Sequence, residues 1–268
     1  MQENVVLQIS ACFINDLALA WIHERVPTNV PPLPDLWFSF LPEINGAILI
    51  TECIMIFLLI NTFIIIFLHQ YKLIVTTRVF FCAALCYTFR ALCITILQVP
   101  VPSVHTYCAP KLGSDLGIIL QRIQKIFWSL GIEQLRSREL CGDLIVSGHT
   151  ISIFIALCTF KQYAPRRIAF LTYIYTVCAI IASACILLAR KHYTFDVLLG
   201  YLTATRVFWT YHSLQNSYQK GEFDENALNQ SFWSFVIPYI EKDVSPLHPL
   251  TNRLIWPFNC SRRSHRYY

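Results

Sequence analysis

The chain has 268 residues, of which 55% are hydrophobic and 14% are charged, and its mean hydropathy is +0.49. Soluble domains carry about 25% charged residues, so the composition excludes an ordinary soluble protein. The net charge of +5 comes without a basic run interleaved with aromatic residues. We therefore expect no nucleic-acid partner, and we attribute the charge to lysine and arginine in the loops of a membrane protein.

Six apolar segments are candidate membrane spans, because a spanning helix needs about 20 mostly apolar residues. They cover residues 5–22, 44–68, 79–98, 144–160, 168–189 and 195–212. We predict an all-α, polytopic membrane protein in which these segments form a six-helix bundle. Residues 1–212 then make up the catalytic membrane domain, and residues 213–268 form a basic, aromatic cytosolic tail without a span of its own.

Four charged residues stand out within these segments. Asp16 lies in the first, Arg90 in the third, and Asp196 and Arg206 in the sixth. Charged side chains in a membrane face the bundle interior or a wet cavity. A frayed or partly wet helix is the first explanation for Asp16. The other three residues indicate a polar pocket inside the membrane.

The distribution of lysine and arginine among the short loops predicts the orientation, because cytosolic loops carry more of them. The loops after the second and fourth segments hold Lys72, Arg78, Lys161, Arg166 and Arg167. Both termini share this side of the membrane. We therefore predict cytosolic termini and a long non-cytosolic loop over residues 99–143.

The chain has eleven cysteines, and most lie within apolar segments, where they are expected to act as small buried hydrophobic residues. No Cys-x-x-Cys pair indicates a zinc or redox site. Cys108 and Cys141 flank the long loop, and they could form a disulfide if that loop faces an oxidising compartment.

Two short segments hold the residues that we expect to perform chemistry. Cys141 to Thr150 reads Cys-Gly-Asp-Leu-Ile-Val-Ser-Gly-His-Thr, at the start of the fourth predicted span. His192 to Asp196 reads His-Tyr-Thr-Phe-Asp, at the start of the sixth. The chain crosses the membrane twice between them, so both starts lie on the non-cytosolic face. We therefore expect His149 and His192 at a common depth.

The spacing within these segments suits phosphoryl transfer. His192 and Asp196 are four residues apart and share one face of a helix, so the carboxylate can hold one imidazole nitrogen and leave the other as base or nucleophile. Ser147 and Gly148 open a helix whose unpaired N–H groups favour a phosphate, and His149 can protonate the departing alcohol oxygen. We predict no metal and no cofactor, because no aspartate-rich motif is present to hold magnesium.

A structural explanation also exists for each of these residues alone. A single histidine in a membrane helix is as readily a helix contact as a catalyst, and Asp143 could cap the helix that follows. The two segments together, on one side of the membrane, are far more typical of a catalytic site.

The sequence resembles the sphingomyelin synthases, or ceramide cholinephosphotransferases, which are related to the phosphatidic acid phosphatase superfamily. The resemblance runs in order from about His23 to His212. Besides the two histidine segments, the matching stretches are His23 to Pro27, Pro31 to Asp35, Glu43 to Gly46, Tyr87, Arg90, Pro100 to Pro102 and Thr205 to His212.

The resemblance implies that His149, His192 and Asp196 are catalytic. In the implied mechanism, His192 attacks the phosphorus of phosphatidylcholine, diacylglycerol leaves, and the ceramide primary hydroxyl takes up phosphocholine. The residues expected to contact the lipid substrates are Asp143, Ser147, Gly148, Arg90, Lys191 and Arg206. The sequence does not decide between Golgi and plasma membrane, and it leaves a homo-oligomer open.

Lys191 departs from the family pattern, which has an acidic residue that bears on head-group choice before the second histidine. A cation there would repel a choline or ethanolamine ammonium, hold the lipid phosphate, or snorkel to the interface. Synthesis of ceramide phosphoethanolamine, phospholipase-C-like hydrolysis and a catalytically silent lipid-binding role therefore stay open. A plain lipid phosphatase is disfavoured, since Cys185 and Ile186 stand where those enzymes have Ser-Arg, and no Lys-x6-Arg-Pro motif occurs.

Overall fold

The computed structural model describes residues 2–27, 30–113, 115–129, 132, 140–242, 244 and 252–255, with the backbone alone for residues 2–8. Over these residues the fold is all-helical, as predicted, apart from an isolated β-bridge between His69 and Leu254. The α-helices are α1 (Gln2–Ile22), α2 (Leu36–Phe40), α3 (Ala47–Leu68), α4 (Lys72–Ile96), α5 (Leu116–Ser129), α6 (Gly148–Tyr163), α7 (Leu171–Leu188), α8 (Thr194–Lys220) and α9 (Ile237–Glu241). Short 3-10 helices cover Arg166–Ile168, Ala227–Gln230 and Ser234–Val236.

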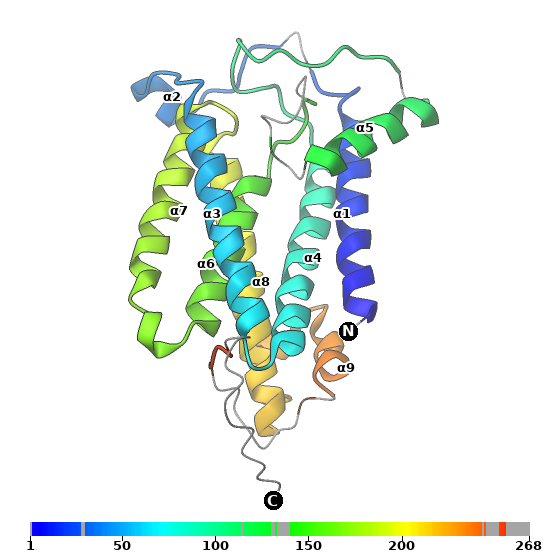
Figure 1. Cartoon of the computed structure of the whole chain (residues 1–268). Coiled ribbons are helices and arrows are strands. Elements are labelled where there is room, and N and C mark those ends of the chain that lie inside the picture. The colour runs from blue at the N-terminus through cyan, green and yellow to red at the C-terminus, as the bar shows by residue number, and fades with distance from the viewer. Residues whose placement is uncertain are drawn as a thin grey trace, which may run out of the picture.

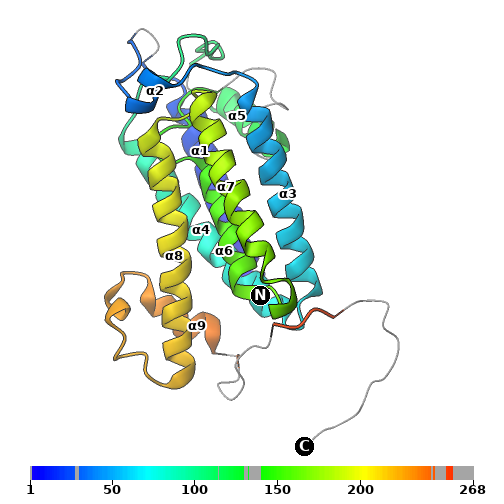
Figure 2. The same ribbon diagram turned by 90° about the vertical axis from the view of Figure 1, so that its left-hand side faces the viewer.

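Six long helices form the bundle, and they correspond to the six predicted segments. α1 packs against α4, α3 packs against α6 and α7, and α8 packs against α6 and α4 (Figures 1 and 2). In the described part of the chain, α3, α4 and α7 are long and apolar enough to cross a membrane. The chain therefore has the helices of a membrane protein. α6, α8 and the part of α1 from Ile9 to Ile22, which is apolar but shorter, do not reach that threshold by themselves.

The bounds of three helices differ most from the predicted spans. α4 begins at Lys72, before the predicted start at residue 79. α6 begins only at Gly148, since the lead-in of four residues before it is not helical and Ile145 within it has φ 82°. α8 continues to Lys220, where Gly221 adopts a left-handed conformation with φ 77° and ends the helix. A glycine tolerates this conformation without steric penalty.

The described part of the predicted tail packs back onto the bundle. Glu241 on α9 receives hydrogen bonds from the Nε and Nη2 atoms of Arg78 on α4 at 2.9 and 2.6 Å, and from the Tyr211 hydroxyl at 2.7 Å. All three side chains are buried. Farther along, the Ile255 N–H donates to the Leu68 carbonyl at 2.7 Å. The predicted boundary at residue 212 falls inside α8, and residues after 255 lie outside the described part.

The two ends of the bundle differ in what they carry. The N-terminus of α1, the α3–α4 turn, the α6–α7 turn and α9 lie at one end (Figure 1). α2, α5 and the loop that follows α4 lie at the other end, together with the first turns of α6 and α8 (Figure 1). Both histidine segments are therefore at the end opposite to the start of α1 and to α9.

Candidate functional site

The first turns of α6 and α8 are joined directly. The Ser147 N–H donates to the Asp196 carbonyl oxygen at 3.2 Å. Gly200 on α8 lies so close to α6 that a Cβ atom there would come within 2.9 Å of the Thr150 Cβ. The glycine thus permits a contact that any larger residue would prevent, and this contact sets the relative position of the two histidine segments.

His149 and His192 face each other as a result of this contact. Their ring centroids are 6.5 Å apart, with an interplanar angle of 65°. Both side chains are buried, at 7% and 2% exposed. The structure therefore brings together the two histidines at a common depth, as the sequence predicts, and the separation leaves room for a reacting group between the rings.

Asp196 lies beside His192 within the first turn of α8. Its Oδ2 atom is 3.7 Å from the His192 Nδ1 atom, and it accepts a hydrogen bond from the Tyr193 N–H at 3.0 Å. The backbone bond fixes the carboxylate, so Asp196 is positioned to orient the imidazole. With Nδ1 turned to Asp196, the Nε2 atom of His192 is the nitrogen left for a substrate.

Glu52 on α3 is a carboxylate at the site that the sequence reasoning missed. Its Oε1 atom is 3.8 Å from the His149 Nε2 atom, and its side chain is buried. The signal was present in the sequence, because Glu52 is an acidic residue inside the apolar segment 44–68, and ionisable residues within a membrane are functional by default.

The start of α6 is capped by Ser147 and not by Asp143. The Ser147 hydroxyl accepts a hydrogen bond from the Thr150 N–H at 3.3 Å. Two residues earlier, the buried Ile145 has φ 82°, which is an outlier for a β-branched residue. Such strain concentrates at functional sites.

Arg90 on α4 ties this lead-in to the bundle. Its Nε atom donates to the Val146 carbonyl at 2.9 Å, its Nη1 atom donates to the Asn15 side-chain oxygen, and its Nη2 atom pairs with the Asp143 carboxylate. Because a Cβ at Gly148 would lie 3.4 Å from this guanidinium, the start of α6 and the positive charge are adjacent. The expectation that Arg90 faces the bundle interior is confirmed, since it is buried.

Two cavities meet at Asp143. The larger, about 280 Å³, lies among α1, α3, α4, α5 and α6 and is lined by Arg90, Gly148 and His149 together with apolar residues such as Met55 and Leu59. The smaller, about 50 Å³, is lined by Lys191 and His192 and by the loop after α4. Each histidine therefore lines one of the two cavities, and Asp143 lines both.

Of the two remaining predicted substrate residues, the structure places Lys191 at the site and Arg206 away from it. Lys191 lines the smaller cavity beside His192. Arg206 has an exposed side chain, lines neither cavity, and lies about 15 Å along α8 from Asp196 at 1.5 Å per residue. The expectation that Arg206 faces a polar interior is wrong, because its long side chain can extend along the helix toward the interface.

Within the described residues, no group of three or more His, Cys, Asp or Glu side chains is arranged to hold a metal ion. The absence of a metal and of a cofactor stays a prediction.

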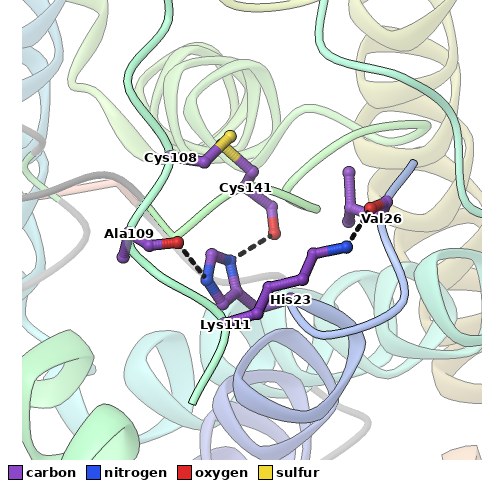
Figure 3. The surroundings of a disulfide bond; sticks show 6 residues. All are labelled: His23, Val26, Cys108, Ala109, Lys111 and Cys141. Carbon is purple, nitrogen blue, oxygen red and sulfur yellow. Dashed lines mark hydrogen bonds between the residues drawn. A yellow bond between two sulfur atoms is a disulfide. The ribbon is translucent and has the colours of Figure 1, made fainter. Parts of the chain in front are cut away.

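A disulfide between Cys108 and Cys141 closes the long loop (Figure 3), so the suggested pairing is confirmed. It lies next to Gly142, which has φ 123°. A Cβ atom added at Gly142 would lie 3.0 Å from the Val26 Cγ2 atom, so a larger residue does not fit there. Asp143 follows directly. The disulfide therefore anchors the segment that leads into the site.

His23 holds the same region from the end of α1. Its Nδ1 atom is 3.1 Å from the Cys141 carbonyl oxygen and its Nε2 atom is 3.1 Å from the Ala109 carbonyl oxygen (Figure 3). Nearby, the Lys111 ammonium donates to the Val26 carbonyl at 2.8 Å. Burial lowers the pKa of the His23 imidazole below its ordinary value of 6.5.

The start of α8 is held by the segment before α2. The Asp35 carboxylate accepts hydrogen bonds from the Thr194 N–H and hydroxyl at 2.7 and 2.8 Å. The Tyr193 hydroxyl donates to the Pro100 carbonyl at 2.9 Å. These contacts give a structural role to two of the matching stretches, Pro31 to Asp35 and Pro100 to Pro102.

Comparisons with known proteins agree with this geometry. Residues 140–213, which contain both histidine segments, match the family described as PAP2 superfamily C-terminal. Sphingomyelin synthase-related 2 of Caenorhabditis elegans is 58% identical over 229 residues, covering 85% of this chain and 70% of that protein. The human phosphatidylcholine:ceramide cholinephosphotransferase 1 is 33% identical over 92% of this chain and 60% of its own length, and the mouse phosphatidylcholine:ceramide cholinephosphotransferase 2 is 34% identical over 92% and 69%. This similarity over most of the chain shows that the protein belongs to the sphingomyelin synthase family.

Proposed function

We propose that this protein transfers phosphocholine from phosphatidylcholine to the primary hydroxyl of ceramide, giving sphingomyelin and diacylglycerol. The observation that carries the proposal is the approach of His149 and His192 to 6.5 Å between ring centroids, with Asp196 behind His192. The cavities beside the two rings give a lipid head group room to lie against both. Relatives at 33% and 34% identity are named for this transfer.

The first step is attack on the lipid phosphate. The Nε2 atom of His192 forms a bond to phosphorus while the bond from phosphorus to the diacylglycerol oxygen breaks. His149 gives its proton to that oxygen. Asp196, whose carboxylate lies 3.7 Å from the His192 Nδ1 atom, stabilises the positive charge that the ring acquires.

The second step returns the enzyme to its starting state. The ceramide hydroxyl attacks phosphorus and gives its proton to His149, which is now neutral, while the phosphorus–nitrogen bond to His192 breaks. General acid–base assistance of this kind contributes about 10²- to 10⁴-fold to a rate. Water competes with ceramide in this step, so a site that restricts water favours transfer over hydrolysis.

We assign phosphate binding to the start of α6. The N-terminus of a helix favours an anion, and Gly148 lies at this end of α6 beside the buried Arg90 guanidinium, whereas the Ser147 N–H is already bonded to the Asp196 carbonyl oxygen. Lys191 lines the cavity on the His192 side and is assigned to the phosphate, since its charge would repel a head-group ammonium. Asp143, which lines both cavities, is the acidic residue placed to attract that ammonium.

We place the protein in the membrane with six spans, cytosolic termini and a non-cytosolic site, in the Golgi or the plasma membrane. The basic short loops at the end that holds both termini support this orientation. The disulfide at the opposite end is the bond expected in an oxidising compartment. As a test, Asn229 in Asn-Gln-Ser should stay unglycosylated, so that glycosidase treatment leaves the mobility of the protein unchanged.

The deciding experiment is expression in a host that lacks sphingomyelin synthase, followed by analysis of the products formed from fluorescent ceramide. We expect sphingomyelin from the wild-type protein and none from His192→Ala. The exposed His105 in the loop on the same face provides a matched control, and His105→Ala should retain the activity. Ceramide phosphoethanolamine would reveal an ethanolamine donor, diacylglycerol alone would reveal a hydrolase, and no product would favour a lipid-binding role.

A further inference from the structure

We propose that Glu52 is a positioning residue for His149, which orients the imidazole for proton donation to the departing diacylglycerol oxygen. The inference rests on the proposed function, in which His149 is the proton donor. Its basis is the buried contact of 3.8 Å between the Glu52 Oε1 atom and the His149 Nε2 atom.

Glu52 is aimed at the site by the packing of α3. The hydroxyl of Thr51 donates to the Ala182 carbonyl on α7 at 3.0 Å, and the hydroxyl of Thr62 donates to the Ala156 carbonyl on α6 at 3.4 Å. These two bonds fix the rotation of α3. Met55 and Leu59 follow Glu52 on the same helical face and line the larger cavity with His149. Glu52 is thus the polar end of a face that is otherwise apolar.

The chemistry of this contact resembles that of the other histidine. Asp196 lies 3.7 Å from the His192 Nδ1 atom, and Glu52 lies 3.8 Å from the His149 Nε2 atom. Each carboxylate therefore faces one nitrogen of its ring, at a distance beyond that of a hydrogen bond. For His192 the nitrogen left for the substrate is Nε2, and for His149 it is Nδ1.

Other ionisable groups near His149 are engaged elsewhere. They come from the elements around α6 and are Asp16 on α1, Tyr87 and Arg90 on α4, Asp143 in the lead-in, and His192 and Asp196 on α8. Asp143 pairs with Arg90, Tyr87 shares a hydrogen bond with Ser152, and Asp196 lies beside His192. α7, which also packs on α6, has no charged residue. Glu52 is therefore the carboxylate that faces the His149 ring.

The test compares two variants of Glu52 in the purified full-length protein, reconstituted in phosphatidylcholine vesicles with fluorescent ceramide. In Glu52→Gln the shape is kept and the charge is lost. We expect kcat at pH 7.5 to fall by at least about tenfold, with KM for ceramide within about twofold. Glu52→Asp should recover much of the lost activity.

Cys53→Ala is the matched control. It alters the residue next to Glu52 on α3, whose side chain is exposed, and it should keep the wild-type kcat. Thermal unfolding of each variant establishes that it is folded, and if Glu52→Gln does not fold, Glu52→Asp provides the test through a smaller loss of kcat.

Two results would overturn the role of Glu52. These are an unchanged kcat in Glu52→Gln and a Glu52→Asp variant no better than Glu52→Gln. Absence of sphingomyelin from the wild-type protein is a different result, since it would overturn the proposed function itself.

Discussion

The imidazole rings of His149 and His192 lie 6.5 Å apart between centroids, although the whole of α7 separates them in the chain. A shared phosphate needs two groups within reach of one atom, and catalytic contacts lie at about 2.6–3.2 Å. Two rings at this separation can each reach a phosphorus-bound oxygen or the phosphorus itself between them. The two histidines are therefore expected to act on one phosphate.

Removal of the carboxylate beside His192 should impair transfer without unfolding the protein. Asp196→Asn keeps an oxygen that can accept from the Tyr193 N–H, but it no longer stabilises a positive ring. We expect sphingomyelin formation to fall by about 100-fold or more, with an unchanged melting temperature. Retention of near-wild-type activity in this variant would contradict the role given to Asp196.

Loss of the Arg90 charge should destabilise the protein as well as inactivate it. Arg90→Met removes the partner of Asp143 and the hydrogen bonds to Val146 and Asn15. Breaking a buried ion pair costs about 3–5 kcal/mol, and Asp143 is partly exposed, so we expect the lower end of that range from thermal or denaturant unfolding. Arg167→Met, at an exposed position, is the control and should leave the unfolding free energy unchanged.

The packing of the C-terminal segment should depend on Arg78 and Glu241. Both side chains are almost fully buried, so Arg78→Met leaves an unpaired carboxylate and should lower the unfolding free energy by about 3–5 kcal/mol. The double variant with Glu241→Met should be more stable than Arg78→Met alone, because no buried charge is left without a partner. A double variant whose losses simply add would show that the pair is not coupled.

The disulfide should stabilise the lead-in to the site. Cys108→Ser leaves Cys141 reduced, and the loss of a native disulfide lowers stability by about 2–5 kcal/mol. Because Asp143 follows Cys141 by two residues, we expect sphingomyelin formation to fall as well. The bond itself is checked by maleimide labelling, which should modify Cys108 and Cys141 only after reduction.

His23 should make the protein sensitive to acid. Burial lowers the pKa of its imidazole from 6.5 in the folded protein, so the unfolded chain binds a proton more readily. The contribution of His23 to stability is then complete above pH 6.5 and is lost as the pH falls toward the folded pKa. His69, whose pKa burial also lowers, acts in the same direction. The melting temperature should fall from pH 7.5 to pH 5.5, and by less in His23→Gln.

Several parts of the site could be read from the sequence because they are local. The four-residue spacing keeps the side chains of His192 and Asp196 close together, at 3.7 Å. The prediction that both share one helix is wrong, because His192 precedes the start of α8 at Thr194. Ser147 before Gly148 is a common way to begin a helix. Even the pairing of Cys108 with Cys141 could be suggested, since both flank one loop. The missed or displaced features are those that depend on contacts between distant segments, such as Glu52 against His149 and Asp35 against Thr194.

Taken by itself, the sequence determined that the protein is helical and of membrane type, that its histidine motifs begin two helices at one end, and that it resembles the sphingomyelin synthases. These properties follow from apolar runs and short spacings, which require no knowledge of neighbours. Only the tertiary structure decided that Gly200 lets α8 approach α6, that Glu52 from α3 lies 3.8 Å from the His149 Nε2 atom, and that Arg206 has an exposed side chain. The reason is that the rotation of each helix about its axis is set by packing against the others, and hydropathy along one segment does not contain it.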